Sequence, residues 1–572
     1  MNDEIAEAGE SRPRRHLLLA VMVVVLGLVA GLVKSYLTVG VSPDGLHFID
    51  YARDLGNLEP ARCYRGAWSR HGPLLRSWLD GVGAYVPALT VMEYYDPHPG
   101  YPLLLLASKR CLDIFQPGND FQSWIRAAQL AGALAWIVLA LGCLLLGREL
   151  LGMPAALVGT WCLAVSPFLV DQRSNALSDV PALACLILSC YFAVRVLRAG
   201  KAIDAIGCGL AGGLGYLVRP EALQVVCYAA LLLGGQLLYA RQRHHARLLL
   251  LLACSAALLC VPYMIIRGQV LTRSFHSLSG AESMCPTLDR QLYANSLLSN
   301  LEAEFERRSL DVNSWPCMMI KGLLRFWSGW CMDVGRLILV FVLIGLVVQR
   351  RQFLLDRGYQ VISCLLVVNL VLLPALLYAR KGYLDPRHVL PTAVLTSFWV
   401  WPGLLAVLHK LGQLVYSRAA FLAPLWRPTA LAVTALFLIT LWRLPHVLTP
   451  LHAEQIGERR AAAWLQRHLE HEEMILDPDG LVSFHGGLEK RNRWWQYKPE
   501  PCAESIAALV ARYPNVGWIV LPNVFISANL VDDWDSKLSN LHIVPARSFS
   551  TGKTSAGNQC QICLYRVERA DS

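Results

Sequence analysis

The amino-acid sequence predicts a mainly α-helical, polytopic membrane protein with about eleven transmembrane helices, interfacial helices in its first long loop and a small α/β domain at its C-terminal end. Two observations support this fold class. Of the 572 residues, 55% are hydrophobic and only 16% are charged, which excludes an ordinary soluble domain. Apolar stretches of ~20 residues, long enough for a helix to cross ~30 Å of hydrocarbon, also recur along the chain.

The first apolar stretch is far longer than the apolar core of a signal peptide, and no small-residue cleavage site follows it. We therefore expect it to remain as an anchor. The arginines of the preceding tail, residues 1–16, favour a cytoplasmic N-terminus, because cationic flanks stay on that side. The predicted spans lie near residues 17–39, 124–147, 154–171, 178–198, 203–219, 221–240, 247–266, 320–348, 359–379, 388–409 and 428–447.

Positive charge decides whether the segment 101–116 is a further span. If it crosses, every later connection changes side and the basic segment 240–247 moves outside; if it lies at the interface, the arginines and lysines of the connections gather inside. The segment is also short for a span and carries three charges. We predict an interfacial segment, within a transmembrane domain of residues 17–449 whose first loop, 40–121, faces outward. The simplest location is a bacterial inner membrane with this loop in the periplasm.

Residues 450–572 are polar and aromatic and lack a spanning run. The stretch "EQIGERRAAAWLQRHL" has the spacing of an amphipathic helix, whereas "GWIVLP" and "QICLYRV" are typical of strands. These patterns predict a small periplasmic α/β domain.

The net charge of +10 does not indicate a nucleic-acid partner. The positive residues are concentrated in short connections between apolar runs, where membrane topology alone explains them. The expected partners are therefore membrane lipids and lipid-borne substrates.

Three carboxylates stand at the starts or ends of membrane elements on the predicted outer face: Asp44 in "SPDG", Asp96 in "YYDPHPGYP" and Asp179 in "LSDVPAL". Carboxylates in a partly desolvated cleft have shifted pKa values and can act as general bases. They can also share a divalent cation, and hard oxygen ligands suit Mg²⁺ or Mn²⁺. We predict that the three meet in one cavity.

Each carboxylate also has a purely structural interpretation. Asp44 can make the turn that ends a span, since Asp-Gly after proline is a turn signal. Asp179 can cap a helix with proline in its first turn, and Asp96 can cap the helix after Pro97. A single one of them would favour these roles, but three on one face favour a site.

Five segments, in this order, resemble the GT-C membrane glycosyltransferases: "SPDGLHFIDYARDL", "DPHPGYPLLLL", "LSDVPAL", "GLGYLVRPEAL" and "DPRHVLP". The nearest branch is the dolichyl-phosphate-mannose protein mannosyltransferase-like group, with the lipid A aminoarabinose transferases as relatives. The resemblance covers most of residues 15–450. It implies a GT-C fold and transfer of a hexosyl or pentosyl group from a polyprenyl-phosphate donor to an acceptor hydroxyl, by inverting displacement.

The resemblance also implies roles for individual residues. Asp44 takes the place of the first-loop acid that serves as catalytic base or orients the acceptor, although Gly45 replaces its usual acidic neighbour. Asp96 and His98 match the D-x-H-P-P signature, with Gly100 in place of the second proline. Asp179 matches the acidic position of the second loop.

The departing lipid phosphate needs positive charge, and guanidinium groups suit phosphate oxygens. Two structural alternatives remain open: Arg219 can form a snorkelling pair with Glu221, and Asp385 can neutralise Arg387. We assign donor-phosphate binding to Arg219, Arg387 and His388, with Lys381 and His98 behind them.

Two other classes of function compete with a transferase. A flippase or transporter of lipid-linked glycans should carry ionisable residues in the middle of its spans, and these spans are almost free of them. A receptor would use residues 450–572 to sense a ligand. The sequence leaves open the sugar and the acceptor, which can be a lipid, a glycan or a protein.

Overall fold

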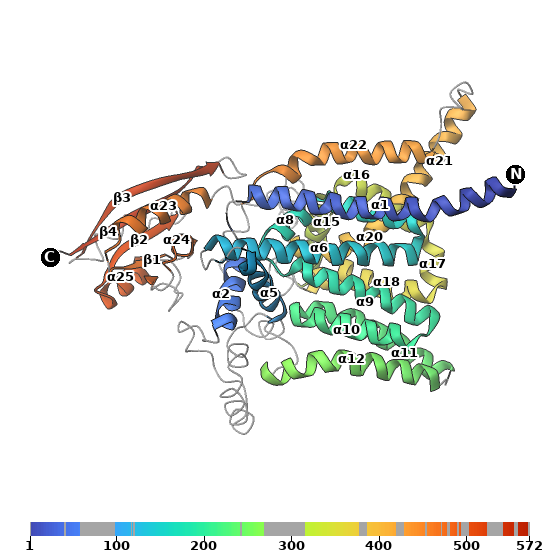
Figure 1. Cartoon of the computed structure of the whole chain (residues 1–572), viewed down its shortest axis with the longest axis horizontal. Helices are drawn as coiled ribbons and strands as arrows, with labels where there is room; N and C mark the ends of the chain where they lie inside the picture. The colour runs from blue at the N-terminus through green and yellow to red at the C-terminus, as the bar shows by residue number, and fades with distance from the viewer. Residues whose placement is uncertain are drawn as a thin grey trace. The chain divides into compact units, whose positions relative to one another are not determined.

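The structure is a computed structural model of the whole chain (Figure 1). It describes residues 2–38, 40, 42–57, 98–115, 117, 121–240, 243–267, 315–376, 386–418, 428–451, 455–470, 472–477, 481–488, 491–492, 503–522, 541–553 and 559–569.

All the elements that the structure describes before residue 450 are helices. Its elements are α1 (Asn2–Leu37), α2 (Pro43–Asn57), α5 (Gly100–Phe115), α6 (Phe121–Leu151), α7 (Met153–Ala164), α8 (Pro167–Ser174), α9 (Asp179–Ala199), α10 (Ala202–Val218), η2 (Pro220–Leu223), α11 (Gln224–Ala240), α12 (Arg243–Arg267), α15 (Trp315–Val334), α16 (Arg336–Val348), α17 (Arg350–Leu355), α18 (Arg357–Val367), η3 (Val368–Leu372), η4 (Pro386–Val389), α20 (Leu390–Thr396), η5 (Ser397–Trp399), α21 (Val400–Arg418) and α22 (Pro428–Leu448).

The chain divides into two compact units. The bundle unit consists of Met1–Lys34, Asp96–Tyr101 and Ala131–Thr449, and the mixed unit of Ser35–Tyr95, Pro102–Leu130 and Pro450–Ser572. The mixed unit thus includes α2 and most of α5 in addition to the C-terminal α/β elements.

Eight helices of the described residues are long and apolar enough to cross a membrane, or up to ten if each of two bent pairs is one span. The bent pairs are α7 with α8, at 63°, and α15 with α16, at 108°. The predicted span near 203–219 forms α10, whose 17 residues fall just below the length of the other spans. All eleven predicted segments therefore contain helix, but the exact count of eleven spans is not confirmed. The 16-residue α5 is not among the candidate spans.

The core of the bundle unit is built around α9 and α10, with α11, α12 and α18 packed beside them (Figure 1). Small residues allow this close packing. A Cβ added to Gly209 on α10 would lie 2.4 Å from the carbonyl oxygen of Leu252 on α12, so the two backbones nearly touch. Glycine at such contacts is typical of helices that pack in membranes.

A network of ion pairs links the end of α9 to the end of α6 and to the residue before α18. The Arg198 guanidinium binds Asp356 through Nη2–Oδ2 at 2.6 Å and Nε–Oδ1 at 3.0 Å, and its Nη1 lies 3.2 Å from Glu149 Oε1. Asp356 also accepts a hydrogen bond from the Gly358 backbone N–H at the start of α18. Partial burial acts to raise the pKa of Asp356, but Arg198 and the backbone donors outweigh it and the pKa is lowered.

Replacing Asp356 with Asn should therefore lower the stability of the folded protein at neutral pH, by about 1–2 kcal/mol, because a charge-assisted bond becomes a neutral one. A carboxyl whose pKa is lowered by folding stabilises the protein above its unfolded pKa of about 4 and loses that effect as the pH falls through the folded value. Thermal unfolding of both proteins in detergent at pH 7 and at pH 3.5 measures this. A stability difference that stayed the same at both pH values would contradict the charge argument.

The C-terminal part of the mixed unit contains both helices and strands. Its elements are α23 (Ile456–His468), β1 (Met474–Leu476), α24 (Leu481–His485), α25 (Ala503–Arg512), β2 (Val516–Pro522), β3 (Leu541–Lys553) and β4 (Gln559–Arg569), and the strand order is β1-β2-β4-β3. β1 and β2 are parallel, whereas β4 is antiparallel to both β2 and β3. The segments predicted from the sequence form α23, β2 and β4.

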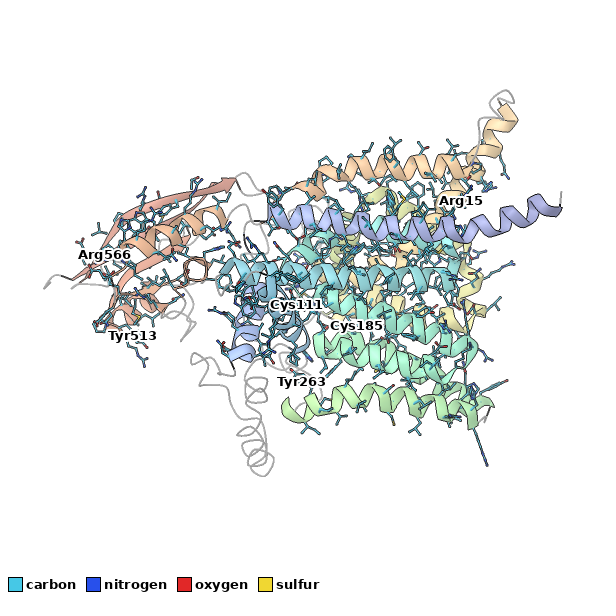
Figure 2. The ribbon with its side chains drawn as sticks, in the orientation of Figure 1. Arg15, Cys111, Cys185, Tyr263, Tyr513 and Arg566 are labelled. Atoms are coloured by element: carbon cyan, nitrogen blue, oxygen red, sulfur yellow. The ribbon has the colours of Figure 1, made fainter. Side chains whose placement is uncertain are left out.

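Alternating side chains of the sheet serve two separate cores. Ile519 and Tyr565 face α25, whereas Val520 and Leu564 face α23 and α24. Helices on both faces bury the sheet, which explains the nearly continuous apolar run of β2. Tyr513 and Arg566, labelled in Figure 2, belong to this part of the chain.

Candidate functional site

A buried ion pair joins the start of α9 to the end of α10. Asp179 is the first residue of α9, and Arg219 directly follows the last residue of α10. Arg219 Nη1 donates a hydrogen bond to Asp179 Oδ1. The Asp179 side chain is 3% exposed and that of Arg219 is 24% exposed. A charged pair so well shielded at the end of a membrane bundle is costly to desolvate, and such groups usually have a function.

The two helices form an antiparallel hairpin, which explains why residues 40 positions apart meet. The hairpin turns at Gly200, whose φ of +63° is a left-handed conformation that favours glycine. At the turn end, Arg195 of α9 pairs with Asp204 of α10, with 3.0 Å between Nε and Oδ1. One Asp–Arg pair therefore lies at each end of the hairpin. At the turn end α9 supplies the arginine, whereas at the other end it supplies the aspartate.

A second carboxylate lies beside Arg219. Glu221 is in η2, and its Oε2 is 3.6 Å from Arg219 Nε. The Glu221 charge also interacts with the imidazoles of His388 and His98. One guanidinium thus sits between two carboxylates, with two histidines in the same electrostatic field.

Aromatic rings surround His98, which is 6% exposed. Its ring centroid is 5.1 Å from that of Tyr216 and 5.1 Å from that of Tyr263, and the two tyrosines are 6.2 Å apart. Tyr263, labelled in Figure 2, lies near the end of α12. The rings come from α10, from α12 and from the residues just before α5, so the bundle packing itself builds this cluster.

Tyr101 brings a phenol close to Asp179. Burial raises the pKa of Tyr101 well above its usual range, and the charge of Asp179 raises it further. The neighbouring Gly100 lets the start of α5 approach the end of α10, because a Cβ there would lie 2.7 Å from the Leu217 carbonyl oxygen. This contact gives a physical reason for glycine at the position where the D-x-H-P-P signature has proline.

The comparisons with known proteins point to one fold. The family model described as dolichyl-phosphate-mannose-protein mannosyltransferase matches residues 102–266, which include Asp179, Arg219 and Glu221. The oligosaccharyltransferase of Archaeoglobus fulgidus in its apo form superimposes with a TM-score of 0.56 and 12% identity, covering 94% of this chain and 74% of that one. A search of curated protein sequences gives no match.

Two further solved structures carry lipid phosphates. The archaeal oligosaccharyltransferase AglB from Archaeoglobus fulgidus, in complex with an inhibitory peptide and a dolichol-phosphate, gives a TM-score of 0.54 at 13% identity over 98% of this chain and 74% of that one. ArnT from Cupriavidus metallidurans, bound to undecaprenyl phosphate, gives 0.52 at 12% identity over 96% and 97%. The chain has the GT-C fold. The resemblance seen in the sequence is thus confirmed.

On this GT-C fold, the structure brings together four of the residues predicted for the site. Asp179 and Arg219 are in direct contact, and Glu221 links them electrostatically to His98 and His388. Arg387 is half-buried beside His388 in η4. Asp179 follows the N-cap residue Ser178, so it is not the cap itself. Arg219 also pairs with Glu221, which is the structural alternative expected for Arg219 from the sequence.

Asp44, Asp96 and Lys381 are the other residues predicted for the site. Asp44 is exposed in the first turn of α2, which belongs to the mixed unit. Ser42 Oγ accepts a hydrogen bond from the Gly45 N–H at the start of that helix. Asp96 and Lys381 lie outside the described residues. The meeting of three carboxylates in one cavity therefore stays a prediction.

Sequence reasoning missed the phenols of Tyr101, Tyr216 and Tyr263. Tyr101 and Tyr216 do fall within the quoted motifs "DPHPGYP" and "GLGYLVRPEAL". Aromatic residues near the ends of spans are ordinarily explained by the membrane interface. That explanation hid the contacts of Tyr216 and Tyr263 with His98 and the interaction of Tyr101 with Asp179.

Proposed function

We propose that the protein is a membrane glycosyltransferase that moves a sugar from a polyprenyl-phosphate donor to an acceptor hydroxyl on the outer face of the membrane. The observation that carries this proposal is the buried Asp179–Arg219 pair, with Glu221 and His98 beside it, at one end of a GT-C bundle. Dolichol-phosphate and undecaprenyl phosphate, bound by two proteins of the same fold, are both polyprenyl phosphates and support this donor class.

In the proposed reaction, the acceptor oxygen attacks the anomeric carbon while the bond from that carbon to the phosphate oxygen breaks. Attack from the opposite face inverts the configuration in a single step. Asp44 takes the proton of the acceptor hydroxyl, and the phosphate leaves with the bonding electron pair. Arg219, Arg387 and His388, with Lys381 and His98 behind them, neutralise the phosphate charge.

The proposed mechanism does not require a divalent cation. The residues proposed as ligands, if one binds, are Asp44, Asp96 and Asp179. Among the described residues, no three histidine, cysteine, aspartate or glutamate side chains gather as metal ligands. Arg219 already occupies one oxygen of Asp179, and a guanidinium next to a carboxylate opposes a second cation. The described residues alone thus do not supply a complete set of metal ligands, and the mechanism above uses only side chains.

The direct test incubates the purified protein with isotope-labelled undecaprenyl-phosphate mannose or undecaprenyl-phosphate aminoarabinose and a membrane extract as the source of acceptors. We expect free undecaprenyl phosphate and label in a second product for at least one donor. In the same preparation, reconstituted into liposomes, a flippase would move labelled donor across the bilayer without breaking the sugar–phosphate bond. That result would replace the transferase by the transporter alternative.

A further inference from the structure

We propose that Asp179 and the donor phosphate compete for Arg219, so that donor binding releases the Asp179 carboxylate for the acceptor. This inference rests on the proposed function and adds a coupling between the two substrates. In the structure, Arg219 is paired with Asp179. With donor, its guanidinium turns to the phosphate, and Asp179 becomes a second carboxylate available to the incoming hydroxyl.

The charges around Arg219 make this exchange necessary. A phosphate that approached the guanidinium while it was paired would add a third negative group beside Asp179 and Glu221, which lies 3.6 Å from Nε. Like charges at such distances repel strongly in a partly desolvated site. Phosphate and Asp179 therefore cannot both keep a short contact with the same guanidinium without cost.

The backbone gives Arg219 room to move. It lies between the last residue of α10 and Pro220, with extended dihedral angles of φ −154° and ψ 134°. Its side chain is thus outside the packed turns of either helix and keeps 24% of its surface exposed. A change of rotamer there leaves the helical hydrogen bonds intact.

The released carboxylate remains in surroundings that suit a proton acceptor. Asp179 is buried, and its Oδ2 has no hydrogen-bond partner among the described residues. The neutral phenol of Tyr101 is close enough to feel its charge.

The pair at the other end of the hairpin is a built-in comparison. Asp204 is 2% exposed and pairs with Arg195, and its Oδ2 also has no hydrogen-bond partner in the part of the chain that the structure describes. Arg195 lies 16 residues after Asp179 along α9, so the two pairs are about 24 Å apart. Arg195 shares its site with the Tyr191 hydroxyl, whereas Arg219 has a second carboxylate and two imidazoles nearby. An ion pair that only holds two helices together does not require those extra groups.

The test measures binding of undecaprenyl phosphate to full-length wild-type protein, Asp179→Asn and Asp204→Asn in detergent, with phosphatidylglycerol as a second probe. Removing the competing charge should tighten undecaprenyl phosphate binding by Asp179→Asn about tenfold, a usual size for coupling between two sites. Asp204→Asn should bind like wild type. In transfer assays, Asp179→Asn should lower both the KM for donor and kcat.

The possible results distinguish a failure of the proposed competition for Arg219 from a failure of the proposed function. Unchanged or weaker binding by Asp179→Asn, or equal tightening by Asp204→Asn, overturns the competition. A wild type that binds undecaprenyl phosphate no better than phosphatidylglycerol overturns the proposed function as well. If Asp179→Asn fails to fold, Glu221→Gln replaces it, because it also removes a negative charge beside Arg219. We expect about threefold tighter binding from that variant, and no tightening would count against the competition.

Discussion

Replacing Asp44 with Asn should abolish sugar transfer, with a loss in kcat of about 10³-fold, while the protein still inserts and folds. A positioned general base accelerates proton transfer by roughly 10²–10⁴-fold, and an amide of the same shape cannot accept the proton. Asp44 is exposed in the first turn of α2, so no packed core depends on its charge. Initial rates at saturating donor measure the effect, because they report kcat without changes in donor binding.

Asp50 supplies the matched control on the same helix. It is half-buried and pairs with Arg53 one turn later, at 3.6 Å between Oδ1 and Nη1. Such a pair contributes little to stability, so Asp50→Asn should keep nearly all activity. If Asp44→Asn stays fully active at unchanged stability, Asp44 is not the catalytic base.

The helices were predictable from the sequence because apolar runs of the right length leave few alternatives in a membrane protein. The bends within two of them were not. The break between α7 and α8 falls just before Pro167, which restricts the preceding residue, and the break between α15 and α16 falls at Gly335, with a φ of +86°. Both signals are present in the sequence, but averaging hydropathy over a whole span hides them.

The individual residues of the site were easier to predict than their contacts. Asp179 and Arg219 each stand in a short motif, whereas their pairing follows from the hairpin that turns at Gly200. Residue spacing alone cannot show that the start of one helix meets the end of the next. Glu221 was expected only as a partner of Arg219, and its interaction with His98 and His388 depends on segments far apart in the chain.

Replacing Arg219 with Gln should weaken undecaprenyl phosphate binding about 100-fold and remove transfer activity, because the guanidinium is the proposed phosphate ligand. It should also lower stability by about 2–3 kcal/mol, since the carboxylate of Asp179, only 3% exposed, is left without its cation. Ligand titration and thermal unfolding of the same preparation measure the two effects. A variant with weak binding and wild-type stability would show that the ion pair contributes nothing to the fold.

The double variant Arg219→Gln with Asp179→Asn separates these two effects. It removes both charges, and its two amides can still share a hydrogen bond, so stability should return to within about 1 kcal/mol of wild type. Donor binding should stay weak, because no guanidinium is left for the phosphate. Across wild type, the single variants and the double variant, we therefore expect stability to depend on whether a buried charge is left unpaired. Donor binding should depend chiefly on whether Arg219 is present. A double variant that binds undecaprenyl phosphate as well as wild type would show that the phosphate is held elsewhere, and Arg219 would then be only the structural partner of Asp179.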